Sequence, residues 1–433
     1  MTSNKKIGLA TATSLVVGNM VASGIFMLPA TLAMYGSISL LGWVLSGIGA
    51  MALALIFSWL SRIMPLAQGG PYAYSHAGMG EFAGFWVAWT YWISVWCTNA
   101  ALAIACVSYL TTFFPILGSS AVASVFTGLA LIWFLTWLNT TGLKNAGAMQ
   151  LITTIAKIIP LALISIGGLY YLNGAHFEIF NRTSDTSISV LVKVTTLTFF
   201  AFLGLECATI PKDIENPEKN IPKATKYGTI ISTLIYILAT IAVMGILPPE
   251  VLSSSKAPLA DAASTIWGPW AKYLIAAGAV ISTFGALNGW ILMQGQVPAA
   301  AAIDKLLPTI FSKENNKGTP VFSLVISSVL VSFLMYFNYN KSLASAYEFA
   351  VLLSTLAVLI PYLFSIISYI ILAFKNVNYP LKPVHIITAI LAFVFSVWAV
   401  VGSGAEIVFW GFIFMLAGLP IFALMKIQGK GKV

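Results

Sequence analysis

The feature that most limits how this chain can fold is a series of long apolar stretches with almost no charge inside them. Several, such as those near 38–62 and 344–374, exceed the ~20 residues that a helix needs to cross the hydrocarbon core of a bilayer. Charged residues make up only 8% of the 433 positions, against about a quarter in a soluble domain. A surface so poor in charge cannot face water on all sides, so the chain is predicted to be an integral membrane protein.

The apolar stretches are predicted to be helices, because lipid offers no partner for unpaired backbone groups. A transmembrane barrel would instead show alternating segments of ~10 residues, and none are evident. The sequence therefore predicts an all-α membrane protein with twelve transmembrane helices in a single transport domain, 1–433. The expected spans lie near 7–32, 38–62, 82–115, 120–139, 146–173, 187–212, 222–248, 268–303, 320–340, 344–374, 384–402 and 404–426.

Basic residues are distributed unevenly between the two sets of loops. If the N-terminus is cytoplasmic, the inward loops, tails and flanking helix ends hold sixteen Lys and Arg residues, and the outward ones hold four. This asymmetry follows the positive-inside rule and predicts that both termini are cytoplasmic. The net charge of +9 is thereby explained by membrane orientation, not by a nucleic-acid partner. We expect a multi-pass protein of the plasma membrane, which is the inner membrane in a Gram-negative bacterium.

Cysteine and histidine give no sign of a metal centre. Cys97, Cys106 and Cys207 all fall inside predicted spans, where a small packing role is favoured over a disulfide. The three histidines lie in different loops or span ends, at no metal-ligand spacing. No metal and no cofactor are therefore expected.

Two of the predicted spans are interrupted. The first contains Gly18-Asn19-Met20-Val21-Ala22-Ser23-Gly24 followed by Pro29, and the sixth contains Phe202-Leu203-Gly204-Leu205-Glu206 followed by Pro211. Glycine and proline both disturb a regular helix, although small residues can also serve helix packing. The interruptions lie five spans apart, as expected when two five-helix units repeat with inverted topology. We therefore predict broken helices one and six, with a transport site between them.

The breaks suit a zwitterion, because the N–H end of a half-helix attracts a carboxylate and the carbonyl end an ammonium. Asn19 and Ser23 would add side-chain partners.

Glu206 is the only acid predicted deep in a span and could bind substrate, gate the site or exchange a proton, unless it is a structural carboxylate. Lys157 could act as a fixed cation in place of sodium or deprotonate during transport; the alternative is a lysine that reaches the interface. Lys193, nearer a span end, is expected to reach the interface.

At these residues the sequence resembles the amino acid–polyamine–organocation superfamily, and within it the basic amino acid and polyamine antiporters such as the arginine–agmatine and putrescine–ornithine exchangers. The resemblance covers nearly the whole chain. Its motifs are Gly18-Asn19, Ser23-Gly24-Ile25-Phe26-Met27-Leu28-Pro29, Gly69-Gly70-Pro71-Tyr72-Ala73-Tyr74, Phe202-Leu203-Gly204-Leu205-Glu206, Glu215-Asn216-Pro217, Asn220-Ile221-Pro222, Gly289-Trp290 and Pro361-Tyr362.

The resemblance implies the leucine-transporter-type architecture, with inverted repeats near 7–173 and 187–374 and two extra helices near 384–426. It also implies alternating access and a possible homodimer in the lipid bilayer. By position, it assigns substrate binding to Asn19, Ser23, Gly24, Ser94, Val95, Asn99, Phe200, Leu203, Trp290 and Ser354. It assigns gating to Tyr91, Glu206 and Tyr362, and ion or proton coupling to Lys157 and Glu206.

Three positions depart from the arginine exchanger. Phe200 stands where that exchanger has tryptophan, Val95 replaces a cysteine, and Lys157 occupies a position that is not lysine there. A lysine at position 157 resembles what is found in proton-coupled or sodium-independent amino acid transporters of the superfamily. We therefore expect a sodium-independent secondary transporter of amino acids, their amines or both, working by exchange or proton coupling. The alternatives are a transporter of neutral amino acids, a non-transporting receptor or subunit, and a membrane enzyme.

Overall fold

The computed structural model describes residues 8–65, 67, 69–141, 159–209, 214–338, 340–376 and 379–430. In these ranges the chain forms helices and connecting segments and no β-strand. Ten helical segments among them are long and apolar enough to cross a membrane, and the shorter apolar helices Ile159–Tyr171 and Val321–Phe337 occupy two further expected positions. The prediction of an all-α membrane protein is confirmed.

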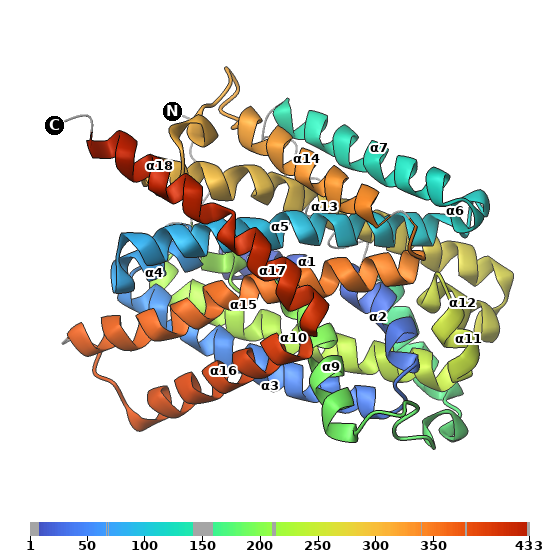
Figure 1. Ribbon diagram of the computed structural model, residues 1–433. Helices are drawn as coiled ribbons and strands as arrows, with labels where there is room; N and C mark the ends of the chain where they lie inside the picture. The colour runs from blue at the N-terminus through green and yellow to red at the C-terminus, as the bar shows by residue number, and fades with distance from the viewer. Residues whose placement is uncertain are drawn as a thin grey trace.

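The long helices run roughly parallel or antiparallel to one another, so one direction serves as the bundle axis (Figure 1). Their bounds are α1 (Leu9–Met20), α2 (Ser23–Ala33), α3 (Ile38–Ile63), α5 (Glu81–Leu110), α7 (Ala121–Thr140), α9 (Ser187–Phe199), α10 (Pro217–Ile246), α13 (Pro269–Ile303), α14 (Val321–Phe337), α15 (Leu343–Lys375), α16 (Pro383–Gly402), α17 (Ala405–Leu416) and α18 (Gly418–Lys430).

Shorter helices fill the connections. They are α4 (Pro71–Met79), α6 (Ile116–Ser119), α11 (Pro249–Ser254), α12 (Pro258–Trp267), the 3₁₀ turns η2 (Gly168–Tyr171), η3 (Gly174–Phe177), η4 (Phe200–Phe202), η5 (Cys207–Thr209) and η6 (Thr309–Ser312), and the π-helical turn η1 (Leu163–Gly167). Proline stands in the first turn of α4, α10, α11, α12, α13 and α16. Its missing N–H is harmless there and its fixed φ favours the helix.

The structure corrects several expected boundaries. The connectors 63–81 and 249–267, which lie between predicted spans, contain α4 and the pair α11 and α12. The seventh span begins at Pro217, five residues before the predicted position, since a helix can continue into water beyond the point where its sequence becomes charged. The twelfth span is divided at Ala417 into α17 and α18.

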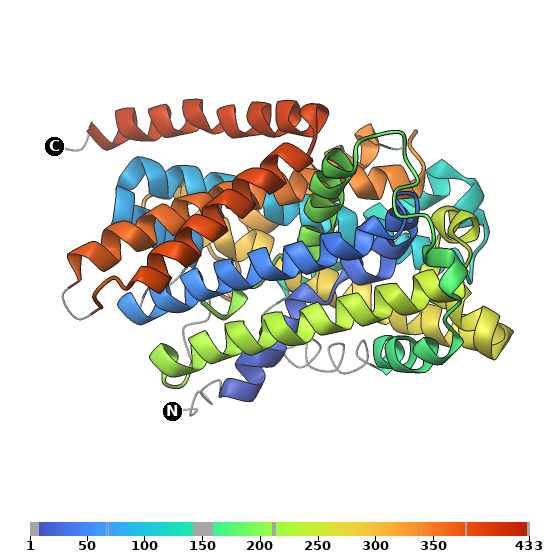
Figure 2. The ribbon, with the colours of Figure 1, turned by 90° about the horizontal axis from the view of Figure 1, so that it is seen from below.

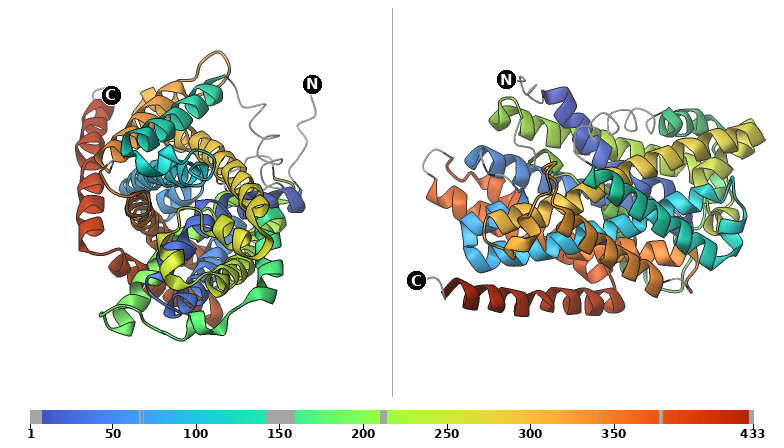
Figure 3. Two further views of the ribbon diagram at one scale, coloured as in Figure 1. Left: turned by 90° about the vertical axis from the view of Figure 1, so that its right-hand side faces the viewer. Right: turned by 90° about the horizontal axis from the view of Figure 1, so that it is seen from above.

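The centre of the bundle is formed by α5, which contacts α13, α15, α14, α7 and α4. In contrast, α17 and α18 lie along the outside, as Figure 2 and the left view of Figure 3 both show. Large apolar side chains such as Phe126, Trp137, Ile387 and Phe412 are exposed on the outer helices α7, α16 and α17. Such a surface is stable only in lipid. The broken helices, which carry the candidate site, lie inside this shell.

Candidate substrate site

The first break separates α1 from α2 at Val21 and Ala22. Ala22 has φ −122° and ψ −134°, outside the helical region, and no side chain caps the N-terminus of α2. The first turn of a helix has N–H groups without an intrahelical partner, so α2 begins with donors beside the buried hydroxyl of Ser23. These donors and the helix dipole favour an anionic group at this point.

The second break follows α9. The 3₁₀ turn η4 ends at Phe202. After Leu203, Gly204 adopts φ +99°, a left-handed angle that residues with side chains rarely take. The chain resumes as a short turn in which Cys207 N–H donates to the carbonyl of Gly204 (3.0 Å). The predicted interruption of the sixth span is therefore present.

The two breaks pack directly against each other. A Cβ added to Gly24 would lie 2.8 Å from the Cβ of Ala201, and one added to Gly204 would lie 3.1 Å from the Cβ of Asn19. The Asn19 side chain is also within hydrogen-bonding reach of the Cys207 thiol. A methyl group at Gly24 would clash with Ala201, and the left-handed φ of Gly204 favours glycine there. The two breaks thus lie against each other.

Glu206 lies directly after the second break and joins three parts of the bundle. Its Oε1 accepts a hydrogen bond from Tyr91 of α5 (2.6 Å), and its Oε2 accepts one from Tyr362 of α15 (2.5 Å). All three side chains are completely buried. Among the fully buried residues that the structure describes, Glu206 is the only one with a charged side chain. We call this group of three residues the carboxylate latch.

The predicted polar contacts of α5 and α15 are used to hold the two helices together. Ser354 lies 2.6 Å from Thr98, oxygen to oxygen, and donates to the carbonyl of Ser94 (2.9 Å). The Ser94 hydroxyl donates to the Tyr91 carbonyl of its own helix (2.7 Å). Both serines lie one to two helical turns from the carboxylate latch, but their hydroxyls are bonded within the protein.

Other predicted contact residues are apolar or incompletely paired. Val95, Phe200 and Leu203 are buried, and the ring of Phe200 meets Tyr347 edge to face at 6.2 Å between centroids. Within the described ranges, Asn99 Oδ1 and Trp290 Nε1 are buried and have no hydrogen-bond partner. Their substrate-binding roles stay predictions.

Three tyrosines outside the predicted site contact the two interrupted segments. Tyr347 lies with its hydroxyl 3.3 Å from that of Ser23, Tyr109 donates to the carbonyl of Phe26 (2.7 Å), and Tyr236 donates to the carbonyl of Ala201 (2.7 Å). Tyr347 could have been found, because it precedes Ser354 by seven residues and so shares its helical face. Tyr236 offered no such signal.

The two lysines predicted within spans have different outcomes. Lys157 lies outside the described residues, so its proposed coupling role stays a prediction. Lys193 was expected to reach the interface; its side chain is 45% exposed, but its Nζ also lies 3.5 Å from Glu348 and 5.4 Å from the centroid of the Tyr35 ring. It therefore links α9 to α15 instead of ending in the interface alone.

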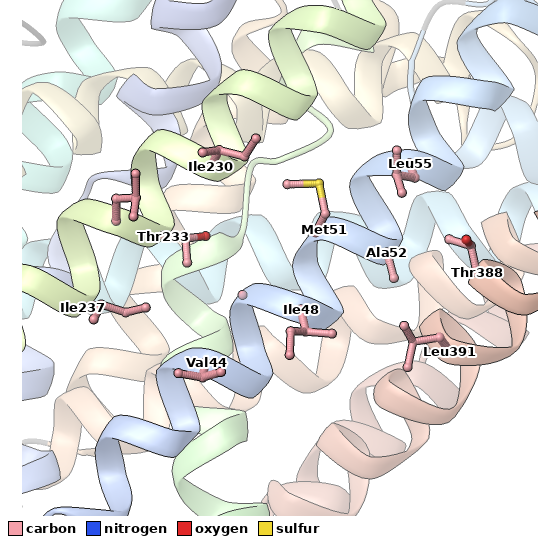
Figure 4. Close-up of a pocket in the computed structure, with 12 residues that line it drawn as sticks. Val44, Ile48, Met51, Ala52, Leu55, Ile230, Thr233, Ile237, Thr388 and Leu391 are labelled. Carbon is pink, nitrogen blue, oxygen red and sulfur yellow. The ribbon is translucent and has the colours of Figure 1, made fainter. Parts of the chain in front are cut away.

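A separate groove of about 450 Å³ lies between α3, α10 and α16. Figure 4 shows its lining, in which Val44, Ile48 and Met51 of α3 face Ile230 and neighbouring residues of α10. The hydroxyls of Thr233 and Thr388 are its only polar side-chain groups. Because it offers no charged partner for a carboxylate or an ammonium, we do not assign the solute to it. No group of three or more possible metal ligands occurs in the part of the chain that the structure describes.

Comparison with known proteins shows the family of the chain. The sequence matches the amino acid permease family over residues 7–419. The chain belongs to this family. It is 34% identical over 432 residues to the cadaverine/lysine antiporter of Escherichia coli strain K12, an alignment that covers 98% of this chain and 94% of the relative. It is 30% identical over 441 residues to the arginine/ornithine antiporter of Pseudomonas aeruginosa, with 98% and 92% covered.

Membership of the amino acid permease family confirms two predictions. The resemblance to the amino acid–polyamine–organocation superfamily is correct, and the protein is a membrane transporter and not an enzyme. As a permease, the chain carries a small solute across the membrane.

Proposed function

We propose that this permease is a sodium-independent antiporter that exchanges cationic amino acids and their amines by alternating access. The observation that carries the proposal is the buried Glu206 beside the second break, bonded to Tyr91 and Tyr362. A lone carboxylate in a transporter core favours a cationic solute over a neutral one. The substrates named for the relatives, lysine, cadaverine, arginine and ornithine, are all amines or cationic amino acids.

In the proposed site, the α-carboxylate of the substrate binds at the N-terminus of α2, next to Ser23 and Gly24. Asn19, across from Gly204, contributes a side-chain amide on the other side of the break. Phe200, Leu203 and Val95 form apolar walls, and Trp290, Asn99, Ser94 and Ser354 contact the side chain of the substrate. The carboxylate latch controls passage toward one side of the membrane. The contact between Tyr347 and Ser23 controls passage toward the opposite side of the membrane.

The proposal is tested by counterflow in liposomes. Purified protein is reconstituted with unlabelled lysine inside, and uptake of labelled lysine is followed with sodium or choline outside. Exchange is expected to depend on internal lysine, arginine, ornithine or cadaverine and to be equal in the two salts. Uptake abolished in choline would refute sodium independence. Preferred exchange of leucine over lysine would favour the alternative of a neutral amino acid transporter, and no counterflow of any amino acid would favour a receptor.

The location of the site is tested separately. Asn19→Leu and Ser23→Leu are expected to weaken transport of every substrate, because both residues lie where all substrates share the same α-carbon groups. Asn340→Leu, at an exposed position between α14 and α15, is the matched control. Unchanged exchange in both site variants would remove the assignment.

The same proposal includes the finer organisation. We propose inverted repeats near 7–173 and 187–374, and contacts between four of the five expected partner pairs support it: α3 with α10, α5 with α13, α7 with α14, and the two breaks with each other. The extra helices near 384–426 lie outside the repeats. We further propose a homodimer in the plasma membrane, or the inner membrane of a Gram-negative bacterium, with both termini cytoplasmic. The start of α1 and the end of α18 lie toward the same end of the bundle in Figure 2 and in the right view of Figure 3, which agrees with that topology.

A further inference from the structure

A line of hydrogen-bonded side chains begins at Asn99 and crosses the bundle from α5 through α13 and α14 to α7. The Nδ2 of Asn99 on α5 donates to Oε1 of Gln294 on α13 (2.6 Å). The Nε2 of Gln294 donates to Ser328 Oγ (2.7 Å) and to the carbonyl of Leu324 (3.3 Å), both on α14. Ser328 Oγ lies 2.6 Å from Oγ1 of Thr136 on α7. All of these polar side chains are buried, so no water competes for their bonds.

A backbone carbonyl sets the orientation of the Gln294 amide. Since the carbonyl of Leu324 can only accept, Gln294 must turn its nitrogen toward α14 and its oxygen toward Asn99. At the other end, Thr136 donates to the carbonyl of Ile132 in its own helix (2.7 Å). The Ser328 hydroxyl hydrogen is within reach of two acceptors, Thr136 Oγ1 (2.6 Å) and the Leu324 carbonyl (3.0 Å), and with either one its Oγ can still accept from Gln294. Turning the Gln294 amide over would place its oxygen against the Leu324 carbonyl, and that arrangement is unfavourable.

The consequence appears at Asn99. Because Asn99 must use its nitrogen for Gln294, its oxygen faces elsewhere, and this Oδ1 is buried without a hydrogen-bond partner in the described part of the chain. One turn away on the same two helices stand Val95 and Trp290, and the indole N–H of Trp290 is also buried and without a partner among described residues. An acceptor left unpaired at this depth is unfavourable unless a ligand supplies a donor.

We propose that Gln294 is a positioning residue that fixes the Asn99 amide with its oxygen toward the solute. The site would thereby select an ammonium or guanidinium group at the end of the substrate side chain. With the amide reversed, the same position would present an NH₂ group, which repels a cation. This inference rests on the function proposed above, and it names Gln294 as a determinant of cation preference although it does not itself touch the solute.

Kinetics of exchange test the proposal. Gln294→Met keeps the length of the side chain but cannot orient Asn99. The KM for labelled lysine is expected to rise about 10-fold, the size of one lost hydrogen bond to a charged group, with the maximal rate within about twofold. Inhibition by norleucine, which has the chain of lysine without its ammonium, should stay the same. In its protonated form, the carboxyl of Gln294→Glu still donates to the Leu324 carbonyl and offers an oxygen to Asn99, so its KM for lysine should stay near that of the unmodified protein.

The matched control is Asn288→Leu. It removes another buried amide pair of α13, in which Asn139 Nδ2 donates to Asn288 Oδ1 (3.0 Å), with no link to Asn99. Equal weakening of lysine and norleucine by Gln294→Met, an unchanged KM for lysine, or the same effect in Asn288→Leu would each overturn the positioning role. If Gln294→Met does not fold, a 10-fold higher KM in Gln294→Glu would overturn it alone. Absence of lysine exchange in the unmodified protein would instead refute the proposed function.

Discussion

Tyr362→Phe removes one of the two hydrogen bonds that hold Glu206 in the carboxylate latch and leaves the aromatic ring in place. The bond joins α15 to the segment after the second break, and a phenylalanine ring fits the same buried space. On the proposal that these two segments separate when this side of the site opens, the variant should open more often.

The size of the effect follows from the bond. A hydrogen bond to a charged group contributes about 1.5–3 kcal/mol, and every ~1.4 kcal/mol changes an equilibrium about tenfold. If the bond exists only in the closed state, its loss raises the open population roughly 10- to 100-fold. Tyr91 keeps its own bond to Glu206, so the latch is weakened and not abolished.

Cys207 gives a direct readout of this opening. It follows Glu206 in the chain and is 5% exposed in the closed arrangement. With Cys97 and Cys106 replaced by alanine, a membrane-impermeant maleimide should label Cys207 in Tyr362→Phe about 10- to 100-fold faster than in the parent. Labelling is measured from each side of the vesicle membrane, and the acceleration should occur from one side only.

The matched control is Tyr369→Phe, the same substitution two turns further along α15. The Tyr369 ring packs against Trp59 and His385 and does not reach Glu206. Equal labelling rates in Tyr362→Phe, Tyr369→Phe and the parent would refute the argument that the latch holds this side closed.

Three further outcomes follow from the site. Gly24→Ala places a methyl group 2.8 Å from the side chain of Ala201, so it should lower the melting temperature and abolish exchange; Gly174→Ala, with open space around its Cβ, should do neither. Phe200→Trp supplies a ring that binds cations better, and should lower the Kd for arginine roughly fivefold, or about 1 kcal/mol, in isothermal titration, whereas an unchanged Kd would place the guanidinium elsewhere. Lys157→Ala should remove the pH dependence of lysine uptake into proteoliposomes, and a retained profile would assign Lys157 a structural role.

The sequence by itself determined that this protein lies in a lipid bilayer, and it also determined where the helices are interrupted. Apolar stretches of sufficient length can satisfy their backbone in lipid only as helices, so the membrane class and most spans could be read directly. The breaks were also readable, because Gly204 and the Gly18–Gly24 segment are local exceptions within otherwise uniform runs. The expected start of α10 was wrong, since the charged residues after Pro217 mark the membrane boundary and not the helix boundary.

Only the tertiary structure decided how the candidate site is held. Glu206 was a plain candidate from the sequence, but its position between Tyr91 and Tyr362 depends on how α5 and α15 cross the second break. The Asn99–Gln294 contact joins residues 195 positions apart, and neither residue carries a local signal of its partner. Hydrophobic patterning records which side of a helix is buried; it does not record which buried donor meets which acceptor. That pairing is set by helix packing over long range, and it appears only when the bundle is assembled.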